Sequence, residues 1–518
     1  MSTPADTTPP KRSWSGRRIH FIGVGGAGMS GYARAAHALG AQVSGSDRAV
    51  SPYTERLASD GVLQAQIGDH DAANVPDGDD GVEVIYSSAV APENPERAAA
   101  RARGLPERPR AELLGELTAL RRTIAVAGTH GKTTTSAMLV CALRAAGMAP
   151  DWLVGGAVGV GEANAQWTGA SEWLVVEADE SDRSMLMLDV EIAVLTNVEL
   201  DHHATFGSLG ELREAFRAFL ARARGAIVVW NRPELLELVP AGALAPDTGV
   251  AQPSDTGGIS APDVGWISVP DTRGEAAWAR AAGVQVVPHD APEPALTDGG
   301  SRFGWRGHEV TLAVPGAHNA LNAIAALEAA RLTGADEERA VAGLAEFHGA
   351  GRRFQLMGRT TRGARVYEDY AHHPTEVAAT LAGARTLGQA RGLVAVFQPH
   401  LYSRTAIFAR EFGSALAQAD VAVVLDVYPA RERAEDHPGV TGLLIAQAAA
   451  DATHGKPVYW LPTFADAEPV LRELLDSGDV CVVMGAGDVD ELARRLVGTD
   501  AAGTDDDASD DDVWCRES

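Results

Sequence analysis

The 518-residue chain holds 44 Lys and Arg residues against 70 Asp and Glu residues, which gives a formal net charge of -26 at pH 7. This acidic balance disfavours binding to nucleic acid, because such binding depends on many cationic contacts to phosphate. The length exceeds what a single hydrophobic core supports, so we expect several domains. No apolar run approaches the roughly 18 residues that span a bilayer, and the start has no apolar signal region, so we expect a cytoplasmic protein without a transmembrane segment.

Apolar runs alternate with helical patterns along the chain. This alternation is typical of parallel sheets with crossover helices and predicts the α/β fold class. We expect residues 1–17 to be disordered, as well as residues 499–518, where eight acids stand against one Arg. A stretch near 240–300, rich in Gly, Pro, Asp and Ala, indicates surface excursions with only short strands. Strands are expected at 18–24, 41–47, 82–88, 123–128, 172–179, 191–198, 226–230, 393–400, 421–429, 457–462 and 480–487.

A glycine-rich loop follows the first predicted strand. HFIGVGGAGMSG contains G-x-G-x-x-G as Gly23, Gly25 and Gly28, and Asp47 lies about 20 residues farther on, as in dinucleotide-binding loops. The backbone and the positive helix end of such a loop suit a diphosphate. The motif leaves open whether the ligand is NAD, FAD or another nucleotide.

A second glycine-rich loop, VAGTHGKTTT, follows the predicted strand at 123–128 and precedes a helix that we expect to begin near Lys132. Lys occurs at three positions only, whereas the other 41 basic residues are Arg. A Lys side chain fits inside a tight loop as a compact charge, whereas Arg is a planar fork. The loop departs from G-x-x-x-x-G-K-[ST] at Val126, but it still predicts a polyphosphate site, with Lys132 on the outer phosphates and Thr133 on Mg²⁺.

Carboxylates and an imidazole follow the next two predicted strands of this region. Glu177 and Asp179 end the first strand, and Asp201 and His202 come just after the second. Phosphoryl transfer needs such groups near a metal ion at the ends of neighbouring strands. The combination indicates a magnesium-nucleotide site and argues against a plain dehydrogenase.

Further motifs extend these patterns over most of the chain, and together they resemble the muramyl (Mur) ligase family. Within the family the chain is most similar to the members that join L-alanine to UDP-N-acetylmuramate. The resemblance implies an N-terminal Rossmann-like domain at 18–114, a central P-loop ATPase-like sheet at 115–348 and a C-terminal Rossmann-like α/β domain at 349–498. The motifs are GVGGAGMSG, SGSD (44–47), GTHGKTTT, EADESD (177–182), TNVELDH (196–202), PGAHNALNAIAA (315–326), GRRF (351–354), DYAHHPTE (369–376), FQPHLYSRT (397–405), DVYPARE (426–432) and MGAG (484–487).

The resemblance also implies the roles of individual residues. The UDP sugar would meet the first domain, ATP and Mg²⁺ the second, and L-alanine the third. The implied ATP-binding residues are Gly128, Thr129, His130, Gly131, Lys132, Thr133, Thr134, Arg353, His318, Asn319, Asn322 and Asp369, and the implied magnesium ligands are Thr133, Glu177 and His202. The implied UDP-sugar residues are Gly25, Gly26, Gly28, Met29, Ser30, Ser46, Asp47, His70, Ser87 and Ser88, and the amino-acid residues are Tyr370, His372 and Arg404.

The implied reaction is an ATP-dependent ligation in peptidoglycan precursor synthesis. The lactyl carboxylate of UDP-N-acetylmuramate would attack the γ-phosphate to form an acyl phosphate, and the amine of L-alanine would displace phosphate. Lys132, Arg353 and the magnesium held by Glu177 and His202 would neutralise the developing charge, and His372 would help to remove the proton of the amine.

Three alternatives stay open, and two departures bear on them. The chain could be the recycling ligase that attaches a murein tripeptide, a folylpolyglutamate synthase, or a nucleotide-gated regulatory protein that joins nothing. Leu401 replaces an Arg found in some family members, and no Lys lies between Lys132 and Lys456 to serve as the carbamylated Lys of some sister ligases. The oligomeric state does not follow from the sequence.

Overall fold

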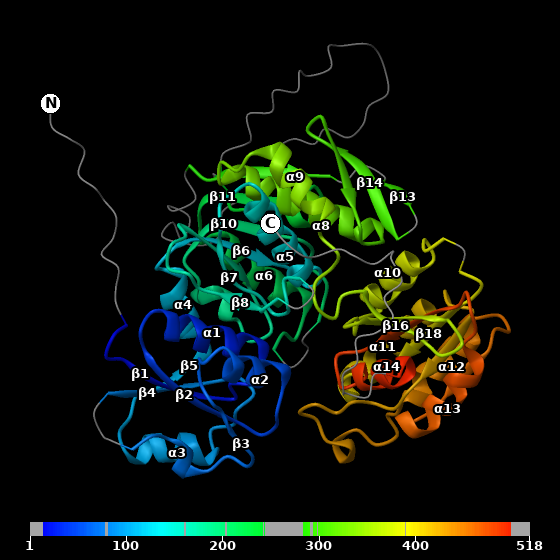
Figure 1. Cartoon of the computed structure of the whole chain (residues 1–518), viewed down its shortest axis with the longest axis horizontal. Helices are drawn as coiled ribbons and strands as arrows, with labels where there is room; N and C mark the ends of the chain where they lie inside the picture. The colour runs from blue at the N-terminus through cyan, green and yellow to red at the C-terminus, as the bar shows by residue number, and fades with distance from the viewer. Residues whose placement is uncertain are drawn as a thin grey trace. The chain divides into compact units, whose positions relative to one another are not determined.

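The computed structural model describes residues 14–77, 81–159, 162–201, 205–241, 243, 283–290, 294–297, 299–388 and 390–498, and Figure 1 shows the course of the chain. The chain divides into two compact units. The first runs up to Arg353 and includes residues 386–388, and the second contains the rest of the chain from Phe354 onward. Both units are built from parallel sheets that helices cover, so the predicted α/β fold class is confirmed.

The first sheet of the N-terminal unit has five parallel strands in the order β3-β2-β1-β4-β5. The strand β1 lies at its centre because four of its five residues, in RIHFI, are buried. Such continuous burial is typical of a parallel strand covered on both faces. The elements are β1 Arg18–Ile22, α1 Ala27–Ala38, β2 Gln42–Asp47, α2 Pro52–Ser59, β3 Gln66–Ile67, a 3-10 turn Ala72–Asn74, β4 Val82–Tyr86, α3 Pro95–Ala102, β5 Glu107–Pro109 and α4 Arg110–Thr118.

The second sheet of this unit has seven strands in the order β12-β11-β10-β6-β9-β7-β8, all parallel except β8. The strand β6 lies between β9 and β10 and is parallel to both, so the carboxyl ends of the three strands lie at the same edge of the sheet. The elements are β6 Arg122–Ala127, α5 Lys132–Ala145, β7 Asp151–Leu153, β8 Ala165–Gln166, β9 Trp173–Glu177, a 3-10 turn Ser184–Met187, β10 Val190–Leu195, α6 Leu209–Leu220, β11 Ala223–Trp230, α7 Pro233–Leu236, β12 Gln285–His289, α8 Ala317–Leu332 and α9 Glu337–Ala345.

The end of the stretch near 240–300 contributes a strand to the seven-stranded sheet, which we did not expect. Residues 244–282 lie outside the described residues, but β12 is an edge strand of the seven-stranded sheet and pairs in parallel with β11. Its residues Val286 and Val287 are buried, which explains why the segment joins the sheet instead of forming a surface excursion. A separate antiparallel sheet follows, made of β13 Ala295–Thr297, β14 Gly300–Trp305 and β15 His308–Leu312.

The C-terminal unit contains a six-stranded sheet in the order β16-β17-β21-β18-β19-β20, in which β16 alone is antiparallel to its neighbour. Its central strand β21 is fully buried, with the sequence VCVVM. The elements are β16 Gln355–Arg359, β17 Arg365–Asp369, α10 Pro374–Ala384, β18 Leu393–Phe397, α11 Tyr402–Leu416, β19 Val421–Val424, a 3-10 turn Ala434–Asp436, α12 Gly442–Ala452, β20 Val458–Trp460, α13 Phe464–Leu474, β21 Val480–Met484 and α14 Asp490–Val497.

Residues near the N-terminus differ from the expectation of disorder over 1–17. Residues 14–17 are packed, because the indole of Trp14 is 4% exposed and the guanidinium of Arg17 lies 4.2 Å from the centre of its ring. Arg17 also forms ion pairs with Glu83 at 2.7 Å and Glu116 at 2.8 Å. Residues 1–13 and the acidic tail lie outside the described residues. Within the described part of the chain, no helix has the length and apolarity that a membrane crossing requires.

Candidate active site

The loop between β6 and α5 is shaped by two glycines. Gly128 has φ +134° and Gly131 has φ +80°, in the left-handed region that side chains rarely adopt. A Cβ on Gly128 would lie 2.0 Å from Oγ1 of Thr196, so a larger residue does not fit there. The helix α5 begins at Lys132, as the sequence predicts, and its N-terminal N–H groups face the loop.

Lys132 is held on the inner side of this loop. Its Nζ donates to the carbonyl oxygen of Gly128 at 2.7 Å and to the carboxylate of Glu180 at 2.9 and 3.0 Å. The Glu180 side chain is fully buried. Burial by itself would lower the pKa of Lys132, but the carboxylates of Glu180, Asp179 and Glu177 raise that pKa above its usual value. The ammonium therefore stays charged.

Glu177, the last residue of β9, faces the first turn of α5. Its Oε2 accepts from the hydroxyl of Thr133 at 3.0 Å and from the amide N–H of Gly155 at 2.7 Å. Thr133 and Glu177, two of the three predicted magnesium ligands, are thus in contact. His202, the third predicted ligand, lies outside the described residues.

The segment after β10 forms hydrogen bonds with the loop between β6 and α5. Asn197 accepts from the amide N–H of His130 at 2.9 Å and donates to the carbonyl oxygen of the same residue at 3.0 Å. Thr196 also donates to that carbonyl oxygen, at 2.7 Å, and the hydroxyl of Thr129 donates to the carbonyl oxygen of Glu199 at 2.9 Å. These contacts fix a loop that would otherwise lose much conformational entropy on binding phosphate.

His318, Asn319 and Asn322, which are among the implied ATP-binding residues, lie on α8, and this helix packs against α5. Asn322 approaches the phosphate loop closely, since a Cβ on Gly131 would lie 2.6 Å from its Oδ1. Asn319 donates to the carbonyl oxygen of Pro315 at 2.7 Å and accepts from Asn322 at 3.3 Å. His318 adjoins Gly316 at the helix start, 2.5 Å from where a Cβ on that glycine would lie.

The first glycine-rich loop, between β1 and α1, is hydrogen-bonded to Asp47 at the end of β2. The carboxylate of Asp47 accepts from the amide N–H of Gly25 at 2.8 Å. Gly26 caps α1, and Gly28 lies in its first turn. Met29 and Ser30, which we expected at the sugar, are 2% and 3% exposed. Met29 packs in the hydrophobic core, and the hydroxyl of Ser30 donates to the carbonyl oxygen of Ala27 and accepts from Asn164. Ser87 and Ser88 directly follow β4, beside β1.

A buried carboxylate connects two further predicted sugar residues. Glu96, in the first turn of α3, accepts from Ser46 Oγ at 2.8 Å, from His70 Nδ1 at 2.7 Å, from His20 Nε2 at 2.9 Å and from Asn74 at 3.1 Å. Burial would raise the pKa of Glu96, but these hydrogen bonds lower it to about 2. An ionised carboxylate only accepts, so Nδ1 of His70 and Nε2 of His20 carry protons.

The C-terminal unit gathers its predicted residues at the end of β17. Asp369 accepts from the amide N–H groups of Phe354 at 2.8 Å and Ala371 at 2.7 Å. His372 lies in the following turn, and its Nδ1 is 2.9 Å from the carbonyl oxygen of Tyr370 and 3.3 Å from Oε2 of Glu376. A carbonyl oxygen only accepts, so Nδ1 of His372 carries a proton in this contact.

Arg404 joins this group from the first turn of α11, the helix that follows β18. It is 4% exposed, and its Nη1 lies 3.1 Å from Nδ1 of His400, whose ring contacts that of His372 edge to face with centroids 6.0 Å apart. Leu401 is 8% exposed and has φ +70°. The structure therefore brings Tyr370, His372 and Arg404 together within one unit and turns Leu401 inward.

Three family models match this chain in order. They are described as "Mur ligase family, catalytic domain" over residues 18–122, "Mur ligase middle domain" over 126–241 and "Mur ligase, glutamate ligase domain" over 352–487. A curated relative from Thermobifida fusca, named UDP-N-acetylmuramate--L-alanine ligase, is 41% identical over 501 residues, which covers 93% of this chain and 96% of the relative. The chain belongs to the Mur ligase family.

Two solved structures resemble this Mur ligase along most of its length. The UDP-N-acetylmuramate-alanine ligase of Thermotoga maritima aligns with a TM-score of 0.72 at 26% identity and covers 93% of this chain and 98% of its own. A murein peptide ligase from Psychrobacter arcticus aligns with a TM-score of 0.64 at 23% identity, over 94% of this chain and 100% of its own. The second likeness concerns the fold alone.

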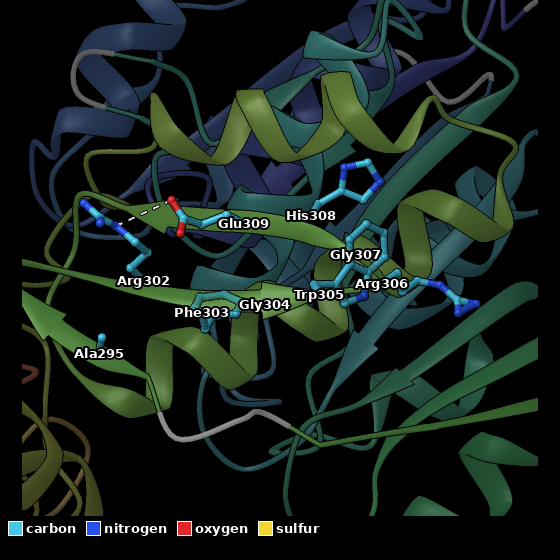
Figure 2. Close-up of a pocket in the computed structure, with 9 residues that line it drawn as sticks. All are labelled: Ala295, Arg302, Phe303, Gly304, Trp305, Arg306, Gly307, His308 and Glu309. Atoms are coloured by element: carbon cyan, nitrogen blue, oxygen red, sulfur yellow. Dashed lines mark ion pairs between the residues drawn. The ribbon is translucent and has the colours of Figure 1, made fainter. Parts of the chain in front are cut away.

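Figure 2 shows a pocket of this Mur ligase on the antiparallel hairpin of β14 and β15. Phe303, Trp305 and His308 line it together with the ion pair between Arg302 and Glu309, at 3.8 Å. None of the predicted site residues belongs to this lining. The predicted site residues lie instead at the strand ends and in the glycine-rich loops.

Several residues of the site were not predicted to have a role in it. Glu180 and Asn197 lie inside motifs that we quoted, but their contacts depend on which strand ends become neighbours. Glu96 lies in a charged helical segment with no motif, and its position gives no signal in the sequence. Arg110 is likewise not singled out by any motif, because it is one of many Arg residues in the chain.

Proposed function

We propose that this Mur ligase joins L-alanine to the lactyl carboxylate of UDP-N-acetylmuramate and converts ATP to ADP and phosphate. The observation that carries this proposal is the 41% identity to the alanine ligase of Thermobifida fusca, which extends over 93% of the chain. The fold does not separate the alanine-adding and tripeptide-adding ligases, because both kinds of structure align over more than nine tenths of the chain. The product would enter peptidoglycan precursor synthesis.

The phosphate loop supports the first step of this reaction. The sugar carboxylate attacks the γ-phosphorus, the bond to the bridging oxygen breaks, and ADP leaves while an acyl phosphate forms. Lys132, kept protonated by Glu180, supplies a fixed positive charge where the γ-phosphate would bind. Phosphoryl transfer depends mainly on such positioning and charge stabilisation. Arg353 is proposed as a second cation for the phosphates.

The contact between Thr133 and Glu177 fits a magnesium ion. Their oxygen atoms are 3.0 Å apart. Two adjacent ligands of octahedral Mg²⁺, each about 2.1 Å from the ion, also lie about 3.0 Å from one another. We propose that Thr133, Glu177 and His202 hold the ion, which when bound neutralises phosphate charge.

The second step needs a neutral amine. L-alanine must lose a proton before its nitrogen attacks the acyl carbon and phosphate leaves. We propose that Tyr370 and Arg404 position the amino acid and that Nε2 of His372 takes the proton, because Nδ1 already donates to the carbonyl oxygen of Tyr370.

We also propose that residues 18–114 bind the UDP sugar, residues 115–348 bind ATP and residues 349–498 bind L-alanine. Because the donor is ATP, we expect the enzyme to act in the cytoplasm.

The decisive experiment is phosphate release from ATP, measured with UDP-N-acetylmuramate and with L-alanine, glycine, L-serine or the murein tripeptide. We expect release only when the UDP sugar and L-alanine are both present. Faster turnover with the tripeptide would favour the recycling ligase. Release that ignores the amino acid would favour the nucleotide-gated regulatory protein, and release with a folate in place of the UDP sugar would favour the folylpolyglutamate synthase.

A further inference from the structure

Arg110, the first residue of α4, lies between the start of α1 and the segment that follows β9. Its Nε donates to Asp182 at 2.7 Å, and its Nη2 donates to Asp179 at 3.0 Å. Both aspartates belong to the segment after β9 that also carries Glu177 and Glu180. The side chain of Arg110 is 15% exposed, so the two ion pairs hold the guanidinium plane in one orientation.

The remaining nitrogen of Arg110 points to the start of α1. A Cβ on Gly28 would lie 3.0 Å from Nη1. No acceptor among the described residues bonds to Nη1, although Nε and Nη2 are both paired. The third edge of the guanidinium is therefore directed at the loop where a diphosphate is expected, next to the N-terminal N–H groups of α1.

Tyr32 presents a second polar group at the same point. The residue is 6% exposed, and its Oη lies 3.6 Å from the same Cβ position of Gly28. Within the described part of the chain its hydroxyl has no hydrogen-bond partner. Burial raises the pKa of Tyr32 to about 12, so the group is a phenol that can donate. The phenol can therefore donate to an oxygen atom of a molecule bound at the start of α1.

We propose that Arg110 and Tyr32 bind an anionic oxygen of the UDP sugar at the start of α1, and that Asp179 and Asp182 position Arg110 for this contact. The proposal rests on the proposed function, which supplies the sugar nucleotide. The anionic oxygen belongs to the diphosphate or to the lactyl carboxylate, both of which suit a fixed guanidinium. The segment after β9 therefore carries both the aspartates that pair with Arg110 and Glu180, which pairs with Lys132 in the phosphate loop.

The test is calorimetric titration of the full-length enzyme with UDP-N-acetylmuramate and with UDP-N-acetylglucosamine, which lacks the lactyl carboxylate. Arg110→Lys should weaken binding of UDP-N-acetylmuramate about 10-fold or more, because it loses an oriented charged hydrogen bond, and Tyr32→Phe should weaken it a few-fold. A loss for both ligands assigns the contact to the diphosphate. A loss for UDP-N-acetylmuramate alone assigns it to the carboxylate.

Matched variants separate this contact from general damage. Arg108→Lys changes a neighbouring arginine that pairs with Glu83, Glu112 and Glu116 instead, and we expect wild-type affinity. Asp182→Asn should weaken sugar binding while the KM for ATP and the melting temperature stay within error. Unchanged affinity in Arg110→Lys and Tyr32→Phe would overturn the proposal, and a change of melting temperature alone in Asp182→Asn would overturn the positioning role. A wild-type enzyme that binds neither nucleotide would instead contradict the proposed function.

Discussion

The carboxylate of Glu180 lies 2.9 Å from the ammonium nitrogen of Lys132, and both groups are withdrawn from solvent, with side-chain exposures of 0% and 13%. Lys132 donates at the same time to two carbonyl oxygens of its own loop, those of Gly128 and Thr129. The ammonium thus has partners on two sides in a space bounded by backbone. Arg carries the same charge on a wider, planar group, which explains why this Arg-rich chain has a Lys here.

We expect Lys132→Arg to lower kcat for L-alanine-dependent phosphate release about 100-fold or more, close to the effect of Lys132→Ala. The guanidinium cannot enter the loop without displacing the γ-phosphate, and a displacement of about 1 Å costs roughly that factor. Lys456→Arg is the matched control, since Lys456 also donates to carbonyl oxygens, of Ala417 and Ala419, but at the surface of the C-terminal unit. A Lys132→Arg variant that keeps most of the wild-type kcat would contradict the argument.

Glu180→Gln should destabilise the N-terminal unit by about 3–5 kcal/mol, because it leaves the Lys132 charge buried without its counter-ion. Urea unfolding measures this change. The double variant Lys132→Met with Glu180→Gln should lose less stability than the sum of the two single variants. Glu162→Gln removes an exposed ion pair with Arg144, in which both side chains are more than a third exposed, and should cost at most about 1 kcal/mol. Additive effects in the double variant would show that the pair is not coupled.

Glu177→Gln should raise the magnesium concentration required for half-maximal phosphate release. The amide can still accept from Thr133 and Gly155, so the loop keeps its shape, but a neutral oxygen is a weaker ligand for Mg²⁺. Titration of Mg²⁺ at saturating ATP measures the effect. Glu172→Gln, at an exposed residue just before the same strand, serves as the control. If the two variants have equal magnesium requirements, Glu177 is not a ligand.

The stability that Glu96 provides should depend on pH. Its pKa in the folded protein is about 2, against 4.5 for an ordinary Glu. A carboxyl with a lowered folded pKa stabilises fully above the unfolded pKa, and this contribution is lost as the pH falls from about 4.5 towards 2. The shift corresponds to roughly 3 kcal/mol at neutral pH. The difference in unfolding free energy between the wild type and Glu96→Gln should therefore be smaller at pH 3 than at pH 7. A constant difference would mean that the Glu96 charge is not stabilised.

The two histidines on Glu96 should have opposite tautomers. Glu96 accepts from Nδ1 of His70 and from Nε2 of His20, so in the neutral rings His70 is protonated at Nδ1 and His20 at Nε2. Nitrogen-15 spectra of histidine-labelled protein, assigned with His70→Gln and His20→Gln, distinguish the two forms. If His70 has the Nε2–H form in the wild type, the hydrogen bond to Glu96 is absent in solution.

The sequence by itself determined the features that depend on local patterns. The α/β class, the strand before each glycine-rich loop and the helix that begins at Lys132 follow from apolar runs and from glycines that only certain turns require. Motif order along the chain also indicated the family, which the relatives confirm. Short strands were expected near 240–300, but the sequence did not predict that one of them, β12, joins the seven-stranded sheet, because a short apolar segment shows its partner only in the folded protein.

Only the tertiary structure decided which side chains complete the site. Glu180, Glu96 and Arg110 are ordinary charged residues in the sequence, and each becomes a partner of a predicted site residue or loop through contacts 48, 26 and 69 positions apart in the chain. The burial of Met29, which the family resemblance places at the sugar, likewise depends on how its helix packs in the fold. Local patterns fix backbone conformation, whereas charge pairing and burial depend on which strand ends the folded sheets bring together.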